Sequence, residues 1–312
     1  MSDVVRAKRK RGSAQPQYAK CKRGSAQPQY AKRKRGSAQP QDMKRVWYWL
    51  IILVLFPAGM GGTGVSAQIQ YAVGQDVAPA FEGWQQNPDG TYSFFFGYLN
   101  RNFEEQVDVP IGPNNNVEPG GDRGQPTHFY PRRQRFVFKV TVPKDWDKQQ
   151  RVIWTLTSHG RTDQAKGWLQ PEWELNDEVI SENNGGGVLE GGNEPPAITG
   201  SSAETVTLPN TLTLTLTATD DGIPKPRQRR TTTTNNTSGD RPRRDRGLLI
   251  KWILYRGPGT VRFDPDTSPD SYGQPVTFTS KVTFSAPGNY VLQAIAGDGQ
   301  LSTTHNVNVT VK

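Results

Sequence analysis

The sequence predicts an all-β protein with two sandwich domains in tandem, preceded by a basic tail and one hydrophobic segment. Short runs of alternating apolar and polar residues recur along the chain, and this two-residue period is that of a strand with one buried face. The chain holds 32 Gly and 24 Pro among 312 residues, so turn residues separate these runs at short intervals. The first predicted domain shows no sustained period of 3.6 residues, which an amphipathic helix would require.

The net charge of +9 is concentrated at the N-terminus. Residues 1–42 contain twelve Lys and Arg side chains against Asp3 and Asp42, whereas the chain from Val46 onward has a net charge of −3. Clustered basic charge normally indicates nucleic acid or an anionic surface as a partner. Because the part expected to fold is slightly acidic, we expect no nucleic-acid partner for it.

A repeat of twelve residues accounts for this basic tail. The segment RGSAQPQYAK starts at Arg11, recurs from Arg23 and, truncated, from Arg35. Its polar composition cannot bury a core, so residues 1–42 are predicted to be disordered. Two interpretations stay open. One is a tandem duplication in the DNA upstream of a true start at Met43, and the other is a basic cytoplasmic arm that contacts anionic lipid or nucleic acid.

Residues 43–67 have the pattern of an export signal. Lys44 and Arg45 precede an uncharged apolar run over residues 46–60, and a small-x-small cleavage site ends the segment. The run is too short to cross a hydrocarbon core of roughly 30 Å as a regular helix, which favours a cleaved signal peptide. The alternative is an uncleaved anchor over residues 46–67. Either interpretation places the C-terminal part outside the cytoplasm, in the periplasm, on the cell surface or secreted.

The sequence offers little catalytic machinery. Its one cysteine, Cys21, lies in the tail, so the remainder has no disulfide, thiolate metal site or cysteine nucleophile. The three histidines are His128, His159 and His305, and no HExxH, CxxC, GxSxG or P-loop pattern occurs. We therefore predict a protein that is not an enzyme and has no cofactor.

The first predicted domain covers residues 68–190. Aromatic and β-branched runs bounded by turn residues indicate its strands. These strands are expected at residues 91–100, 105–111, 135–142, 151–157 and 165–169. In the run 135–142, alternation places Phe136, Phe138 and Val140 on one face.

Aromatic and arginine side chains gather in this domain. Rings beside guanidinium groups can stack on sugars, bases or the side chains of a partner. The candidate binding residues are His128, Phe129, Tyr130, Arg132, Arg133, Trp168 and Trp173. The alternative interpretation of residues 128–133 is an edge strand, in which Pro131 blocks ladder hydrogen bonds and the arginines keep the edge soluble. A sugar site needs Trp84, Trp168 or Trp173 exposed in a groove, whereas a spacer domain buries them.

The second predicted domain covers residues 197–312. Residues 191–196 before it indicate a linker, because turn residues are followed by two prolines that force an extended chain. Its strands are expected at residues 206–208, 212–218, 248–255, 261–263, 276–284, 290–296 and 305–312. A Thr-, Asn- and Arg-rich insertion at residues 223–247 is expected to be a disordered loop. The other interpretation of the insertion is an electrostatic contact with acidic envelope polymer or nucleic acid.

The second domain resembles a known class of module. It has an Asn-x-Pro-Pro start, a strand ending in Asp-Asp-Gly, a strand with Trp252, then GPGxVxF, FxxPGxYxL, AxDG and a closing VxVxV. This order is similar to the PKD-type and related cadherin-like modules of bacterial surface proteins. The resemblance implies an immunoglobulin-like β-sandwich that spaces or binds, so the predicted architecture is two immunoglobulin-like β-sandwich domains in tandem. The first domain, over Phe94 to Pro143, resembles exported proteins of environmental bacteria, which implies no activity.

These observations predict a function class. Asp220, Asp221 and Asp298 are weak calcium candidates, because hard cations take several oxygen ligands, although Asp-Gly is also common in turns. The chain is predicted to be an exported structural or adhesive module of the cell envelope. Its partner is then an envelope component, a polysaccharide or another surface protein. The alternative is a carbohydrate-binding or carbohydrate-processing protein with its site in the first domain.

Overall fold

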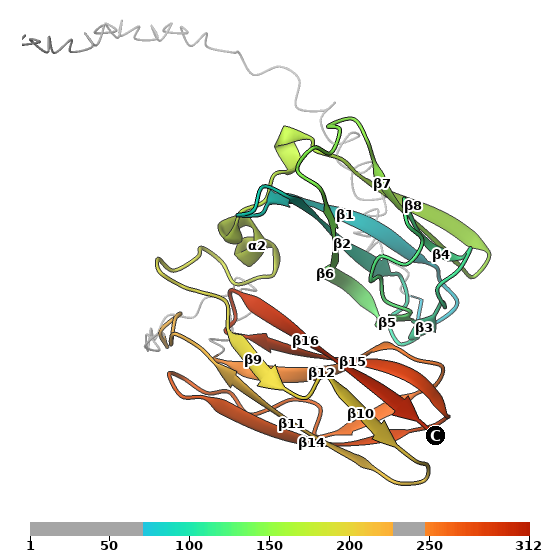
Figure 1. The fold of residues 1–312 in the computed structure, drawn as a ribbon, viewed down its shortest axis with the longest axis vertical. Helices are drawn as coiled ribbons and strands as arrows, with labels where there is room; N and C mark the ends of the chain where they lie inside the picture. The colour runs from blue at the N-terminus through green and yellow to red at the C-terminus, as the bar shows by residue number, and fades with distance from the viewer. Residues whose placement is uncertain (1–70, 227–246) are drawn as a thin grey trace, which may run out of the picture. The chain divides into compact units, whose positions relative to one another are not determined.

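The computed structural model describes residues 71–226 and 247–312. The basic repeats, the predicted export signal and residues 227–246 of the predicted insertion lie outside the described residues. The described residues belong to one compact unit built from two β-sandwiches (Figure 1). Strands dominate, and the described helical segments are a single 3-10 turn and one short α-helix, so the predicted all-β fold is confirmed.

The first sandwich packs two small antiparallel sheets face to face. One sheet has the order β1-β2-β6 and the other the order β4-β7-β8. The strands are β1 (Val77–Gln86), β2 (Tyr92–Asn100), β4 (Asn115–Glu118), β6 (Arg132–Val142), β7 (Val152–Ser158) and β8 (Arg161–Gly167). A two-stranded ribbon joins β3 (Val107–Asp108) to β5 (His128–Phe129), and η1 (Pro171–Trp173) and α2 (Asp177–Asn183) follow the last strand.

Aromatic rings fill the space between these sheets. Trp154 is fully buried, and its ring centroid lies 4.9 Å from that of Phe138 and 6.3 Å from that of Phe129. Its indole Nε1 donates a hydrogen bond to Asn115 Oδ1 at 3.0 Å. Because the one polar atom of the indole is satisfied inside the core, the large ring is buried there without an unpaired donor.

The second sandwich has the strand order of an immunoglobulin constant-type domain. One sheet runs β13-β14-β11-β9 and the other β10-β16-β15-β12, which corresponds to the ABED and CFG sheets of that fold. The first strand is divided between the sheets, and its second half pairs in parallel with the last strand. The strands are β9 (Ala197–Gly200), β10 (Ala203–Val206), β11 (Leu212–Thr219), β12 (Leu249–Arg256), β13 (Val261–Asp264), β14 (Val276–Phe284), β15 (Gly288–Gly297) and β16 (Ser302–Val311). The predicted immunoglobulin-like fold is confirmed by this order.

Alternation along β11 and β14 builds the second core. Leu212, Leu214 and Leu216 are buried while the threonines between them face outward, and β14 alternates in the same way. Across the sandwich, the rings of Trp252 and Phe263 stack with centroids 6.0 Å apart and planes 5° apart. The two-residue period of the sequence therefore separates core from surface directly.

The strand predictions fail at several places in the first sandwich. Phe136 does not share a face with Phe138 and Val140: its φ of 49° interrupts the pleat, and its ring packs edge-on against Phe95 on the other side of the sheet. The predicted strand over residues 105–111 shrinks to the two residues of β3. Strand β1 was not predicted, because its Pro and Gly break the alternation; an edge strand with a bulge tolerates both.

Candidate functional site

The predicted aromatic and arginine stretch does not form one exposed surface. Phe129 is fully buried in the first core, against Tyr98 and Trp154. His128 is also buried, with Nδ1 2.6 Å from Asp108 Oδ1 and Nε2 2.8 Å from Gln106 Oε1. These two candidate binding residues are therefore structural parts of the β3–β5 ribbon.

The two arginines of the stretch are held by the first sandwich as well. Arg133 forms an ion pair with Glu82 at 2.7 Å and donates to the Tyr98 carbonyl oxygen at 3.1 Å. Burial raises the pKa of Glu82, and Arg133 is the main group that opposes this rise. Arg132 has a φ of 69°, and its guanidinium lies 3.9 Å from the centroid of the Phe103 ring.

Tyr130 joins the first sandwich to the second. Its hydroxyl accepts a hydrogen bond from the backbone N–H of Leu254 at 2.9 Å, and its own backbone N–H donates to the Tyr98 hydroxyl at 2.9 Å. Burial raises the pKa of Tyr130 and of Tyr98, so both hydroxyls keep their protons at neutral pH. This candidate binding residue is thus used inside the molecule.

Further hydrogen bonds surround this one. The Thr127 N–H donates to the Tyr255 carbonyl oxygen at 3.1 Å, and the Tyr255 hydroxyl donates to the Gly124 carbonyl oxygen at 2.5 Å. Arg256 donates to the Gln125 carbonyl oxygen at 2.8 Å. We call these residues, with Asp122, Tyr130 and Leu254, the inter-sandwich contact.

The ion pair of the inter-sandwich contact is bidentate. Both terminal nitrogens of Arg256 bind the Asp122 carboxylate, at 2.8 and 3.0 Å, and this bonding lowers the pKa of Asp122. Strand β12 lies at the edge of its sheet. The first sandwich binds the backbone of Leu254 and Tyr255, and residues 266–268 of the second sandwich bind that of Ile250 and Trp252, so this edge is covered rather than open to another strand.

The three tryptophans proposed for a sugar site have different environments. Trp84 is 9% exposed, and its Nε1 donates to the Gln170 carbonyl oxygen at 2.7 Å. Trp168 is half-buried, with the Arg151 guanidinium 5.1 Å from its ring centroid. Trp173 is 42% exposed and stacks on Phe81 at 5.5 Å. Of the three, Trp173 alone presents much of its ring to solvent.

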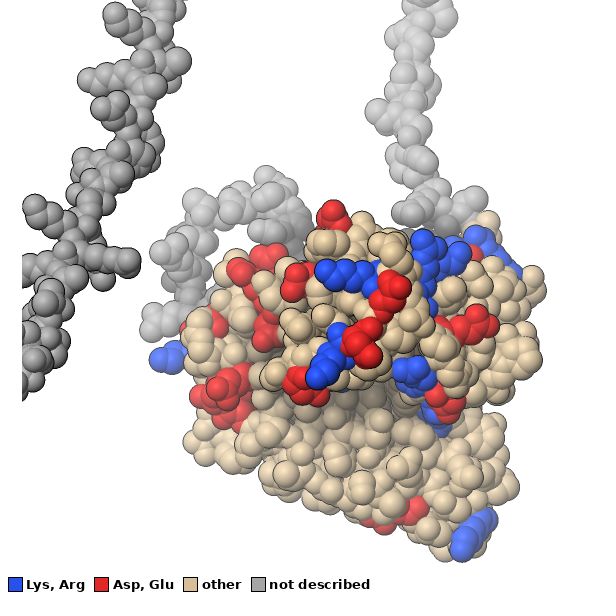
Figure 2. Space-filling model, turned by 45° about the horizontal axis from the view of Figure 1, so that its top comes forward, with Lys and Arg blue, Asp and Glu red and all other residues tan. Residues whose placement is uncertain are grey.

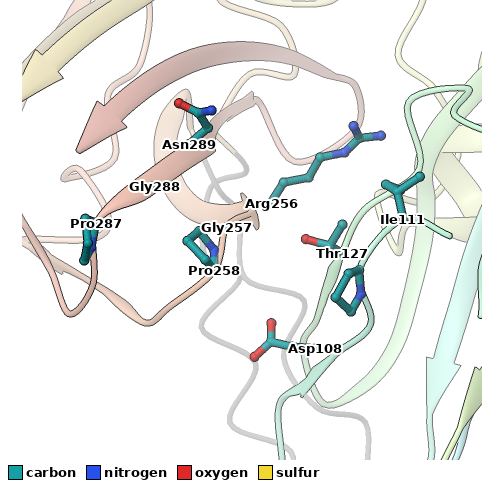
Figure 3. A pocket seen from close by; sticks show the side chains of 10 residues that line it. Asp108, Ile111, Thr127, Arg256, Gly257, Pro258, Pro287, Gly288 and Asn289 are labelled. Carbon is teal, nitrogen blue, oxygen red and sulfur yellow. The ribbon is translucent and has the colours of Figure 1, made fainter. Parts of the chain in front are cut away.

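A pocket of about 410 Å³ lies beside the inter-sandwich contact (Figure 3). One side is formed by the first sandwich, including Asp108 and Ile111, and the other by the second, including Arg256 and Pro258 (Figure 3). Its charged lining residues, Asp108 and Arg256, already bind His128 and Asp122. The pocket therefore holds no free pair of groups for acid–base or nucleophilic chemistry.

Charge is mixed on one face of the described residues. On the face shown in Figure 2, Lys and Arg are interspersed with Asp and Glu, and no broad area carries one sign. Within residues 71–226 and 247–312, no helix is long and apolar enough to cross a membrane.

The three calcium candidates lie at one end of the second sandwich, in the turns after β11 and β15. Asp221 uses both carboxylate oxygens, since Oδ1 accepts the Ile223 N–H and Oδ2 the Glu194 N–H, each at 2.8 Å. Asp298 is 1% exposed, and its Oδ1 accepts two backbone N–H groups. Within the described part of the chain, no three His, Cys, Asp or Glu side chains form a group that could hold a metal ion.

Several residues of these sites were not predicted from the sequence. Asp122 and Arg256 are 134 positions apart, and Tyr130 and Leu254 are 124 positions apart. No local spacing signals such pairs, because their meeting depends on how the two sandwiches pack.

No family model matches the chain, and no curated protein sequence matches it. Among solved structures it is similar to the eight N-terminal immunoglobulin domains of Down Syndrome Cell Adhesion Molecule, with 12% identity, 76% of this chain and 27% of that chain covered, and a TM-score of 0.24. It is also similar to a chimeric titin Z1Z2 tandem, with 12% identity, 76% and 98% coverage and a TM-score of 0.22. Domains 4 and 5 of the S-layer protein SbsC match with 12% identity, 76% and 98% coverage and a TM-score of 0.24.

The fold class follows from the strand order and not from these matches, because TM-scores this low do not establish a shared fold. The chain is an all-β protein with an immunoglobulin-like second sandwich packed against a smaller first one.

Proposed function

We propose that this chain is an exported structural or adhesive module of the cell envelope that acts without catalysis. The observation that carries the proposal is the inter-sandwich contact. The aromatic stretch that best suited a ligand joins the two sandwiches through Tyr130 instead, and the bidentate pair of Arg256 and Asp122 supports the same junction. Two sandwiches fixed to each other form a spacer that holds a partner at a set position.

The partner class in this proposal is an envelope component, a polysaccharide or another surface protein. The sequence resemblance of the second domain to PKD-type and cadherin-like modules of bacterial surface proteins supports it. Retention of the full chain on envelope fractions, prepared from the cells that make it, tests the binding role. We expect retention by the folded protein and none by protein unfolded with heat; equal behaviour of the two samples would contradict a specific binding role.

Export is supported by residues 43–67, whose charge and apolar pattern is that of a signal peptide. We propose that the mature chain begins near Gln68 and lies in the periplasm, on the cell surface or in the medium. Fractionation of the producing cells with N-terminal sequencing tests this. A chain that stays in the cytoplasm with the segment intact would overturn it, whereas an intact chain in the membrane fraction would indicate an uncleaved anchor over residues 46–67.

Trp173 favours a second candidate function, carbohydrate binding. Its exposed ring is supported from behind by Phe81, with ring planes 24° apart, which is a suitable platform for a sugar face. Affinity electrophoresis in gels that contain polysaccharide tests this candidate. Retardation that is lost in Trp173→Ala and kept in Tyr272→Ala, an equally exposed aromatic position in the second sandwich, would support it. If the unmodified chain is not retarded, the carbohydrate-binding candidate is ruled out and the spacer function remains.

A further inference from the structure

Three exposed apolar side chains gather at one end of the first sandwich. Tyr71, Val73 and Phe103 are 51%, 60% and 37% exposed, and they make up half of the large apolar side chains that are exposed in the described part of the chain. The Phe103 N–H donates to the Tyr71 carbonyl oxygen at 3.0 Å, so the two segments that carry them lie side by side. Exposed apolar side chains that cluster in this way mark interaction sites, whereas single ones need no explanation.

A cation borders these side chains. The Arg132 guanidinium lies 3.9 Å from the centroid of the Phe103 ring. Arg132 is exposed and, in the described part of the chain, takes part in no ion pair. We call Tyr71, Val73, Phe103 and Arg132 the end patch. Tyr and Arg each combine an apolar body with a polar tip, which suits the boundary between hydrocarbon and water, and a guanidinium binds phosphate oxygens well.

Charges of both signs surround the end patch. Asp76 binds Arg101 through both carboxylate oxygens at 2.9 Å, so this pair is neutral as a whole. Two glutamates, Glu104 and Glu105, follow directly in the chain after Phe103, and Glu104 is exposed. The end patch therefore carries no broad positive potential that would attract an anionic polymer from a distance. Its partner must instead suit the apolar side chains and a single guanidinium.

The described chain is fastened to the first sandwich from its first residues onward. The Ala72 carbonyl oxygen accepts two backbone N–H groups, at 3.0 and 3.2 Å. Gln75 exchanges two hydrogen bonds with the Asn102 side chain, each at 2.7 Å. These contacts lie on either side of Val73 in the sequence. The end patch is therefore a fixed part of the first sandwich.

The end patch lies close in sequence to the predicted export signal. Residues 61–70 separate it from the apolar run of residues 46–60. These ten residues span at most about 35 Å when fully extended. Any membrane that holds the apolar run therefore has the end patch within this distance of its surface. A lipid bilayer is thus the apolar partner that the sequence itself brings to this end of the first sandwich.

We propose that the end patch lies against the bilayer from which the chain emerges, with its apolar side chains among the lipid headgroups and Arg132 at a lipid phosphate. The inference rests on the export proposed for residues 43–67. It concerns the chain whose apolar run is held in the membrane, as a signal before cleavage or as an uncleaved anchor. Three side chains do not anchor a protein, since even one acyl chain binds a bilayer only marginally. The role of the end patch is to orient the two sandwiches relative to the membrane.

Iodide quenching of a fluorescent label on the full chain tests the proposal. The label is attached at Val73→Cys or, as a control, at Val188→Cys, in a chain whose one native cysteine is removed by Cys21→Ser. The two valines are similarly exposed, at 60% and 66%, and Val188 lies between α2 and β9. The probe is a vesicle of phosphatidylethanolamine and phosphatidylglycerol. We expect vesicles to reduce quenching at position 73 by at least about twofold and to leave quenching at position 188 unchanged.

Variants of the ring separate contact by the end patch from mere proximity to the membrane. With the label at position 73, we expect Phe103→Ser to abolish the protection by vesicles and Phe103→Tyr to keep it, because tyrosine retains an aromatic ring with a polar tip. Tyr71→Ser provides a second variant should thermal unfolding show that Phe103→Ser does not fold. Full protection in both serine variants would overturn the inference.

The remaining outcomes separate this inference from the export proposal. Equal quenching at positions 73 and 188 in vesicles would overturn the contact with lipid and leave export as proposed. Protection at position 73 that is already present without vesicles would indicate a second copy of the chain on the end patch, which also overturns the inference. An intact chain that cell fractionation finds in the cytoplasm would overturn export and the inference together.

Discussion

The backbone N–H of Leu254 on β12 donates a hydrogen bond to the hydroxyl of Tyr130 at 2.9 Å. Leu254 belongs to the second sandwich and Tyr130 to the first. A backbone donor at the edge of one sheet is thus satisfied by a side chain from the other sandwich, where an exposed edge would use water. The junction depends on single atoms of this kind, so it can be tested by removing them one at a time.

Tyr130→Phe removes the acceptor and keeps the ring. We expect the free energy of unfolding to fall by about 1–3 kcal/mol, because the N–H of the buried Leu254 is left without a partner. Chemical denaturation of the full chain measures the change. Tyr71→Phe is the control, since Tyr71 is 51% exposed and its replacement leaves no buried group without a partner. Equal stability of the two variants would contradict a structural role for the Tyr130 hydroxyl.

The sequence predicted burial correctly where the alternation within a single strand determines which of its residues face the core. Thr and Leu alternate over residues 212–218, and the structure buries the leucines as this pattern requires. The pattern failed at Phe136, where a bulge that depends on the partner strand turns the ring to the other face. It could not show that Tyr130 meets Leu254, because neither residue is unusual in its own segment. The candidate sites were therefore predicted from residue type alone, whereas the contacts of those residues depend on packing between segments far apart in the sequence.

The ion pair of Asp122 and Arg256 is expected to contribute only modestly to stability. Asp122 is half-exposed, so a double-mutant cycle of Asp122→Asn with Arg256→Gln should give a coupling energy of at most about 1 kcal/mol at pH 7. Hydrogen bonding from Arg256 holds the pKa of Asp122 below its usual value of 3.8. A carboxyl group whose pKa is lowered by folding stabilises the fold above its unfolded pKa, and this contribution is lost as the pH falls through the folded value.

The coupling energy should therefore persist at neutral pH and decline at an acid pH below 3.8, as the pH falls through the lowered pKa of Asp122. The same cycle measured at the two pH values, in a buffer of constant ionic strength, checks this. A coupling energy that grows toward acid pH would contradict the assigned direction of the Asp122 shift.

Replacement of the buried Trp154 should have a far larger effect than replacement of the exposed Trp173. Trp154→Ala leaves a cavity among Phe96, Phe129 and Phe138 and an unpaired Asn115 Oδ1, so a loss of about 3–5 kcal/mol is expected. Trp173→Ala keeps the core intact and should cost about 1 kcal/mol or less. Thermal unfolding of the two variants measures the contrast, and a similar loss in both would show that the stack on Phe81 is part of the core.

Gly83 is the glycine whose replacement tests the bulge in β1. Its φ is 136°, in the region that favours glycine, and it lies where the pairing of β1 with β2 shifts register. An added Cβ would lie 2.5 Å from the Trp173 carbonyl oxygen and 2.6 Å from the Leu175 side chain, closer than atoms can pack. Gly83→Ala must therefore carry both a backbone cost and a steric one.

Gly160→Ala separates these two costs. Gly160 also has a positive φ, 74°, but an added Cβ would meet nothing within 4 Å. We expect Gly160→Ala to lower the free energy of unfolding by about 1 kcal/mol, the cost of the left-handed backbone alone. Gly83→Ala should lower it further, because η1 and Leu175 must move away from β1 to admit the methyl group. Equal losses in denaturant titrations of the two variants would mean that η1 shifts freely and that its packing on β1 adds little to the stability of the first sandwich.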